Sequence, residues 1–417
     1  MFRLGIISAF LVLMASHAFS AETEDMTDLA TAAEADEVTP KLEGRPWNEF
    51  ENDFLTMRFG YGFLVDTATY MQDEESRQQM DLEPKAYLRD LRFILKGRFK
   101  HAPRLSYSLG YMYDGNTEEW RFRQTGIMIN VPEHNGDFFI GRTKETFSTS
   151  KIMVGYFGWT NERSTANDAF LPILADGLKW TGFGFGKKLV YSAGVFTNVM
   201  TPKVQSYAKN DHQVTAKAVW LPLKNTDSPS VLHLAMGLRH GVALQGNFQY
   251  RSKPESYSAN TYAIDTGKFP GKASDMLGLE VYYQPGSLMF GSEYYWNQVT
   301  SAETQNPLFH GGEVFMSYLF TGEKHPYNER GYFNAVVPSR SAFAGGYGAL
   351  EFVLRYSYSD LDSKLIQGGR FWRITPMFNW YLSEFVRLEF VYGYSELDRF
   401  DLRGNTQYFQ TRFQFTL

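Results

Sequence analysis

The chain has 417 residues, no cysteine, a formal net charge of −5 and an aromatic share of 17%, with 26 Tyr and 35 Phe. The lack of cysteine excludes disulfides and thiolate metal ligands and suits export through an oxidising compartment. The sequence after the N-terminus holds no run of about 18 apolar residues, which excludes helical membrane spans. Aromatic residues beside glycine in predicted strands are typical of transmembrane barrels, and a secreted sandwich or propeller is the alternative.

Two segments precede the predicted strands. Residues 1–20 carry one cation, Arg3, then a short apolar stretch and small residues before Ala21, which is the pattern of a cleaved secretory signal peptide. Residues 21–53 are rich in Ala, Thr and acidic residues and have too few apolar residues to order themselves. We expect an acidic periplasmic leader there, partly disordered, followed by one barrel domain over residues 54–417.

From about Met57 onward, apolar and polar side chains alternate with the period of two that defines a strand. In the last ten residues, Phe409, Phe413 and Phe415 share one face, and Arg412 lies on the other. A strand in hydrocarbon needs this pattern, because a Lys or Arg that faces lipid at the midplane costs roughly 2–4 kcal/mol. The same alternation is clear in residues 87–100, 105–114, 288–297, 350–359, 386–395 and 408–417. The sequence therefore predicts an all-β, antiparallel transmembrane barrel.

The alternation yields about 17 candidate strands, whereas a closed single-chain bacterial barrel has an even number. One candidate is therefore false, and Ser230–Gly241 and Gly246–Lys253 are the suspects, since they could form a single bent element. We expect about 16 strands, enough to leave an aqueous channel.

Connections of two lengths separate these strands, and short and long ones tend to alternate. We expect the short ones to be periplasmic turns and the long ones to be outer loops. The long segments are Thr67–Pro84, Thr146–Ala175, Pro254–Lys272 and Gly322–Ala344. We expect Thr146–Ala175 to fold into the barrel and narrow it, and packing over the rim is the alternative.

Motifs of catalysis are missing from the sequence. Its eight histidines form no HExxH pair, and it has no GxSxG elbow or Walker loop. We therefore expect no enzyme activity, no cofactor, no metal site and no nucleic-acid partner. An enzyme or adhesin built on the same barrel is the less favoured reading.

Basic side chains recur on the strand faces predicted to point inward. A column of cations in a narrow pore replaces the hydration that an anion loses, and arginine matches phosphate oxygens with two parallel donors. The alternative is that these cations pair with Glu280, Glu293, Glu313, Glu351 and Glu389 and only stiffen the wall. The candidate pore-lining residues are Arg92, Lys96, Arg98, Arg121, Arg123, Arg251, Lys253 and Arg355, with Arg89, Lys144 and Arg163 at a rim or constriction.

Short motifs follow one another in a specific order from Met57 to Leu417. They are Arg89-Asp-Leu-Arg92, Ile140-Gly-Arg-Thr-Lys144, Asn161-Glu-Arg-Ser164, Tyr250-Arg-Ser-Lys-Pro-Glu-Ser256, Leu319-Phe-Thr-Gly-Glu323 and Asn379-Trp-Tyr-Leu382. In these motifs the chain resembles the phosphate-selective porin O and P family of Gram-negative outer membranes.

The resemblance implies a 16-stranded barrel in outer-membrane lipid, usually a homotrimer, that passes anions, with phosphate favoured in the best-known members. It places cations of the route at Arg89, Arg92, Arg251 and Lys253. Because Arg89 is out of phase with the inward set, we expect it at the rim or in a bulge. We therefore expect passive diffusion of small anions, with phosphate or related oxyanions as the leading candidates, and a general non-selective porin is the alternative.

Overall fold

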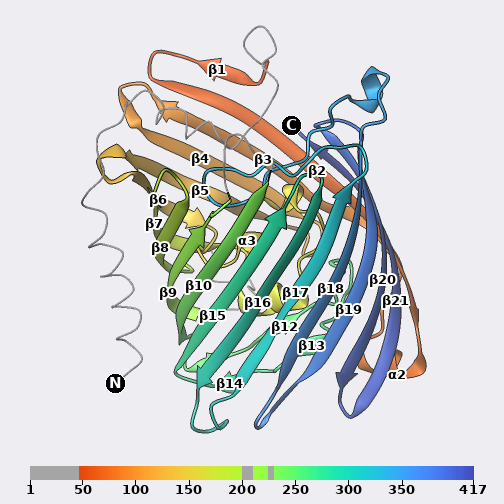
Figure 1. Cartoon of the computed structure of the whole chain (residues 1–417). Coiled ribbons are helices and arrows are strands. Elements are labelled where there is room, and N and C mark those ends of the chain that lie inside the picture. The colour runs from red at the N-terminus through yellow and green to blue at the C-terminus, as the bar shows by residue number, and fades with distance from the viewer. Residues whose placement is uncertain (1–46, 200–209, 224–229) are drawn as a thin grey trace.

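Sixteen antiparallel strands close into a barrel in the computed structural model, which describes residues 47–199, 210–223 and 230–417 (Figure 1). Each strand pairs with the next along the chain, and β2 pairs with β21 from Gly62–Thr416 to Gln72–Thr406, which closes the sheet. Closure pairs the backbone of the first and last strands, as a wall in lipid requires. The strands are β2 (Leu55–Gln72), β3 (Lys85–Phe99), β4 (Ala102–Asp114), β5 (Glu119–Val131), β6 (Gly136–Thr143), β7 (Ala175–Gly184), β8 (Leu189–Thr197), β9 (Asn210–Trp220), β10 (Val231–Ala243), β15 (Ala273–Gln284), β16 (Leu288–Thr300), β17 (Leu308–Leu319), β18 (Ala349–Ser363), β19 (Ile366–Tyr381), β20 (Val386–Arg399) and β21 (Leu402–Thr416).

The alternation read from the sequence is the alternation of the barrel wall. In β21, Phe409 is 44% exposed on the outer surface, whereas Arg412 on the inner face is 4% exposed. The predicted fold class is confirmed. The predicted signal peptide and most of the predicted leader lie outside the described residues, and the short strand β1 (Glu49–Glu51) pairs with the start of β2.

The false strand candidate is Gly246–Lys253. Ser230–Gly241 belongs to β10, a full strand of the wall, so the idea of one bent element is wrong. The chain turns away from the wall after Ala243, with Gln245 and Gly246 at positive φ. Its residues form two short ribbons inside a loop, β11 (Asn247–Phe248) with β14 (Phe269–Pro270) and β12 (Arg251–Ser252) with β13 (Ile264–Asp265). The apolar residues of this candidate, Phe248 and Tyr250, are buried in an internal cluster and do not face lipid.

Strand direction decides at which end each connection lies. We call the end that holds residues 144–174 and 244–272 the loop end, and the end that holds the C-terminus the turn end (lower and upper in Figure 1). The connection 320–348 starts at the turn end. Leu319, the last residue of β17, donates its N–H to the carbonyl of Ser287 in the short turn between β15 and β16 (3.0 Å). Gly322–Ala344 and Thr146–Ala175 lie at opposite ends of the barrel, so the prediction that both are outer loops is wrong, because strand order and not length fixes the end. The predicted loop Thr67–Pro84 also starts too early, since Thr67–Gln72 pairs with β21.

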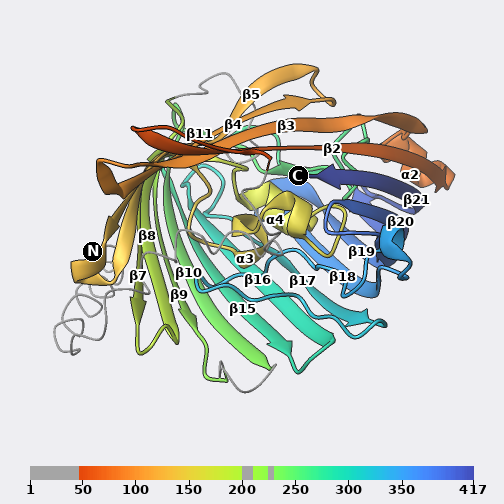
Figure 2. The ribbon, with the colours of Figure 1, turned by 90° about the horizontal axis from the view of Figure 1, so that it is seen from above.

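Three segments fold into the barrel. We call residues 144–174 the inner loop, 244–272 the second loop and 320–348 the turn-end segment. The inner loop carries α3 (Thr149–Ile152), the 3-10 helix η3 (Gly155–Phe157) and α4 (Thr165–Phe170), and Figure 2 shows α3 and α4 inside the ring of strands. The inward position expected for Thr146–Ala175 is confirmed. The other short helices are α2 (Glu74–Gln79), η2 (Pro132–His134) and η4 (Ala342–Ala344). In the described parts of the chain, no helix combines the length and the apolar character needed to cross a membrane.

The inner loop packs against most of the wall and leaves one part of it open. The ring of Trp159 stacks on Phe315 of β17 with a centroid distance of 4.7 Å, and it also contacts Tyr282 of β15 and Phe333 of the turn-end segment. These rings belong to a buried cluster that reaches Val391 of β20. Other contacts join Thr146 of the inner loop to Thr215 of β9 and Tyr156 to Asp90 of β3, so the loop covers the wall from about β9 round to the loop-end half of β3 and leaves the wall around β4–β8 facing open space.

Candidate functional site

On the covered side of the barrel, cations and carboxylates compensate one another. Lys217 of β9 donates to Glu280 of β15 (2.8 Å), and Arg387 pairs with Glu389 on β20. Arg412 of β21 pairs with Asp66 (2.7 Å). A buried charge that has such a partner holds the wall and its loops in place, and it adds no net charge to the channel. On this side of the barrel, the structure therefore agrees with the alternative that inward cations pair with carboxylates and stiffen the wall.

Arg355 belongs to this compensated set. Its guanidinium is fully buried and pairs with Glu255 of the second loop and with Glu313 of β17. It also donates to the carbonyl of Glu162 in the inner loop (2.7 Å). Arg355 lines neither of the two cavities described below, so its predicted pore-lining position is wrong. Two loops cover it, and strand phase alone could not show that cover.

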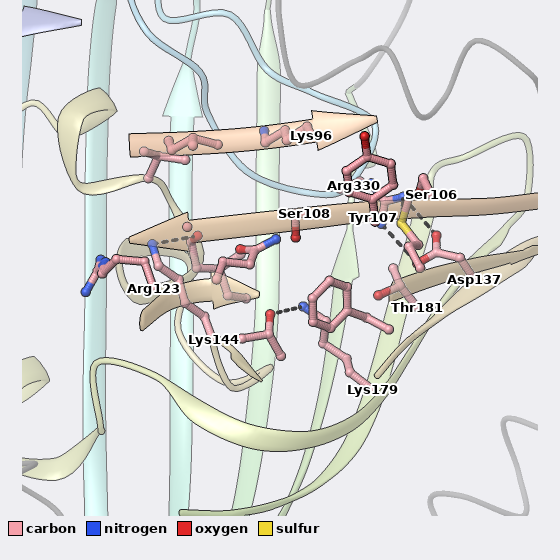
Figure 3. Close-up of a pocket in the computed structure, with 18 of the residues that line it drawn as sticks. Lys96, Ser106, Tyr107, Ser108, Arg123, Asp137, Lys144, Lys179, Thr181 and Arg330 are labelled. Carbon is pink, nitrogen blue, oxygen red and sulfur yellow. Dashed lines mark hydrogen bonds and ion pairs between the residues drawn. The ribbon is translucent and has the colours of Figure 1, made fainter. Parts of the chain in front are cut away.

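The open side holds two cavities that meet inside the barrel. The larger, of about 830 Å³, lies towards the turn end and is the turn-end cavity; the smaller, of about 110 Å³, is the loop-end cavity. Lys96, Arg123, Lys144 and Lys179 project around the turn-end cavity (Figure 3), and Arg98 also lines it. The residues that line both cavities are Arg92, Arg123, Val154, Gly155 and Leu174.

Four cations surround this junction, and we call Arg92, Arg123, Lys144 and Arg163 the cationic cluster. Arg92 comes from β3, Arg123 from β5, Lys144 directly follows β6, and Arg163 lies in the inner loop. A β-bulge between Leu109 and Tyr111 shifts the pairing of β4 with β5 beside Arg123. A Cβ built on Gly155 would lie 3.8 Å from Nη1 of Arg92 and 4.0 Å from Nη2 of Arg163, so both guanidinium groups flank the backbone there.

Neutral carbonyls hold two of the four cluster members. Nζ of Lys144 donates to the carbonyls of Ile152 (3.1 Å) and Met153, and Arg163 donates to those of Ser150 (2.8 Å) and Met153 (3.1 Å). Arg92 pairs with Asp90 (2.5 Å), and within the described ranges it is the one member of the cluster that forms a salt bridge to a carboxylate.

The cluster therefore carries excess positive charge. Burial, followed by the charges of Arg163, Arg123 and Arg92, holds the pKa of Lys144 well below its usual value. Burial likewise lowers the pKa of Arg163. Like charges held this close in a poorly solvated place repel one another, and a bound anion would relieve that repulsion.

Towards the loop end the cations have partners again. The pairing of β2 with β3 skips Arg89, which therefore lies in a bulge, one of the two positions expected for it, and its side chain turns inward. Arg89 then binds Glu162 through two hydrogen bonds of 2.9 Å. Burial alone would raise the pKa of Glu162, but Arg89 and Arg412 lower it to about 2. Arg121 pairs with Glu119 (3.0 Å) and Asp114 (3.4 Å).

Arg251 and Lys253 lie in the second loop and line neither cavity. The guanidinium of Arg251 lies over the ring of Tyr262 (4.2 Å), and Lys253 donates to the carbonyl of Tyr257 (2.9 Å). Burial, with Lys85 nearby, lowers the pKa of Lys253 to about 8. The structure does not bring this pair to the cationic cluster.

Sequence reasoning missed three cations of the turn-end cavity, Arg58, Lys179 and Arg330. Lys179 of β7 alternates with Leu178 and Trp180, so its phase was readable. Arg330 had no such signal, because the turn-end segment was expected outside the barrel. It reaches from that segment to Asp137 of β6 (2.9 Å), and Figure 3 shows the two side by side at one end of the cavity.

A closed barrel with an apolar outer surface and a charged interior that encloses cavities is the architecture of an outer-membrane porin. A family model described as phosphate-selective porin O and P matches residues 57–417, and the chain belongs to this family. The protein is therefore a porin of the Gram-negative outer membrane, and family and fold indicate a channel rather than an enzyme.

Solved porins share the fold at low sequence identity. The anion-selective porin from Comamonas acidovorans superimposes with a TM-score of 0.54 at 13% identity, over 87% of this chain and 100% of that one. The channel DcaP of Acinetobacter baumannii gives 0.55 at 9% identity, over 88% and 99%. OmpT of Vibrio cholerae in its trimer form gives 0.53 at 11%, over 88% and 100%.

A curated relative is more similar in sequence over a shorter stretch. An uncharacterized protein of Caulobacter vibrioides is 31% identical over 122 residues, which are 29% of this chain and 24% of the relative. The matched stretch thus spans about a quarter of that relative's length.

Proposed function

We propose that the protein is an anion-preferring porin, which lets small anions diffuse passively from the loop end to the turn end. The observation that carries the proposal is the cationic cluster, in which four cations at the junction of the two cavities share one carboxylate partner among the described residues. The loop end faces outward in this proposal, since outer-membrane barrels place their longer loops outside.

The charges give the selectivity its physical basis. Two unit charges about 4 Å apart interact by about 4 kcal/mol at an effective dielectric constant of about 20. An anion at the junction gains this attraction from several cluster members and gives up part of its hydration, whereas a cation is repelled. Passage also requires that each site release the anion, which a row of weak sites allows better than one tight site.

Phosphate and related oxyanions are the leading candidates for the permeant ion. Three of the four cluster members are arginines, whose planar donor pairs match tetrahedral oxyanions. The family description and the anion-selective neighbour support the same choice. The trimer form of OmpT from Vibrio cholerae supports a homotrimer in outer-membrane lipid.

The proposal is tested by the reversal potential of the purified porin in a planar bilayer. The potential is measured under a KCl gradient and then under a gradient of potassium phosphate. We expect the sign of an anion-selective channel, and we expect Arg123→Ala to lower the chloride-to-potassium permeability ratio severalfold. Arg104→Ala, which removes an exposed cation at the turn end, is the matched control and should leave the ratio unchanged. A cation-selective wild type, or a ratio near one as in a general porin, would overturn the proposal.

A further inference from the structure

Apolar side chains line the turn-end cavity between its cations. Five of them are half-buried there and come from different parts of the chain: Ile94, Met128, Ile152, Val154 and Tyr332. The interior of a water-filled barrel is ordinarily polar, because its side chains face water. A cavity with several partly exposed apolar side chains therefore departs from a plain ion passage.

The apolar and cationic groups are interleaved on the wall. On β3, Ile94 lies between Arg92 and Lys96 on the inward face, and all three line the cavity. On β5, Met128 follows Arg123 and contacts Arg330 through its sulfur (3.3 Å). A solute that binds against this wall can therefore contact a cation and an apolar side chain of the same strand.

The inner loop also places apolar side chains next to cations, on the side of the cavity that faces the wall strands. Ile152 and Val154 line the cavity, and the carbonyl of Ile152 accepts the hydrogen bond of Lys144. Val154 and Gly155 border both cavities, next to the guanidinium groups of Arg92 and Arg163. Apolar contact is therefore offered directly beside the place where an anionic group would bind.

We propose that, among the anions that the proposed function admits, this cavity binds those with an apolar body, such as aromatic phosphonates and carboxylates, more tightly than inorganic phosphate. The inference rests on the proposed function, because the cationic cluster holds the anionic group. The cavity of about 830 Å³ has the size of sites that enclose drug-sized organic molecules, and a bare oxyanion would leave its apolar side chains exposed to water.

Block of the chloride current by three probes tests the inference on the full-length porin in planar bilayers. Phenylphosphonate, methylphosphonate and inorganic phosphate present similar anionic groups and differ in their apolar part. We expect phenylphosphonate to block at a concentration roughly three- to tenfold lower than methylphosphonate, because its ring buries apolar surface that the methyl group lacks. Inorganic phosphate should block least.

Variants show whether the named side chains cause this difference. Ile94→Thr combined with Val154→Thr replaces a methyl or ethyl group by a hydroxyl and keeps both side chains β-branched, and it should bring the half-blocking concentrations of phenylphosphonate and methylphosphonate to within about twofold. Val195→Thr makes the same chemical change on the lipid-facing surface of β8, where Val195 is 52% exposed, and should leave their ratio as in the wild type.

The outcomes separate this inference from the proposed function. Anion selectivity with equal block by all three probes overturns the organic-anion inference alone. A phenyl preference that survives the double threonine variant also overturns it, because another surface would then bind the ring. A channel without anion preference overturns the proposed function and this inference with it.

Discussion

Glu162 joins the inner loop to the wall, and its substitution should change both stability and its pH dependence. Its carboxylate accepts two hydrogen bonds from Arg89 of β3 and one from Arg412 of β21 (2.6 Å), so one loop residue links two wall strands. In Glu162→Gln, the charge is lost while the side chain keeps its size. Arg89 keeps Asp90 as a partner, and Arg412 keeps Asp66.

The size of the effect follows from the pKa of Glu162. Arg89 and Arg412 outweigh the effect of burial and lower that pKa from 4.5 to about 2. The difference between these two pKa values corresponds to about 3 kcal/mol of unfolding free energy. Because the folded pKa is the lower one, this stability is fully present above pH 4.5 and is lost as the pH falls towards 2.

Urea unfolding of the porin in lipid or detergent, followed by tryptophan fluorescence across this pH range, measures the effect. The wild type should lose about 3 kcal/mol more than Glu162→Gln between about pH 4.5 and 2. Glu329→Gln removes one partner of a half-exposed pair with Lys187 and serves as the control, because such pairs contribute little. Equal losses in wild type and Glu162→Gln would refute the reasoning.

Three further perturbations test other parts of the structure. Arg330→Ala removes the contact between the turn-end segment and Asp137, so the single-channel conductance should rise, and an unchanged conductance would mean that Arg330 does not obstruct the passage. Trp159→Ala removes the ring that anchors the inner loop on Phe315, which should cost roughly 3–5 kcal/mol of unfolding free energy and give a noisier open-channel current, whereas Phe185→Ala at an exposed site should do neither. Arg251→Ala with Lys253→Ala should lower the chloride-to-potassium permeability ratio less than Arg123→Ala alone, and an equal or larger decrease would place the second loop on the ion route.

The candidate site was only partly readable from the sequence. Strand phase placed Arg92, Lys96 and Arg123 on inward faces, and all three line the turn-end cavity. Strand phase also placed Arg355 on the inward face, and it does point inward. Its guanidinium is covered by Glu255, which lies 100 residues away in the sequence. Arg330 could not be found at all, because its position depends on a turn-end segment that folds back into the barrel.

The sequence alone determined the fold class, the outward face of each strand and the family. The fold class and the outward faces follow from a local requirement, since side chains that face lipid must be mostly apolar and uncharged whatever the rest of the chain does. Only the tertiary structure decided which inward cations meet water and which are neutralised. That choice depends on which loops cover which part of the wall, and contacts between residues far apart in the chain, such as Trp159 with Phe315, leave no period in the sequence.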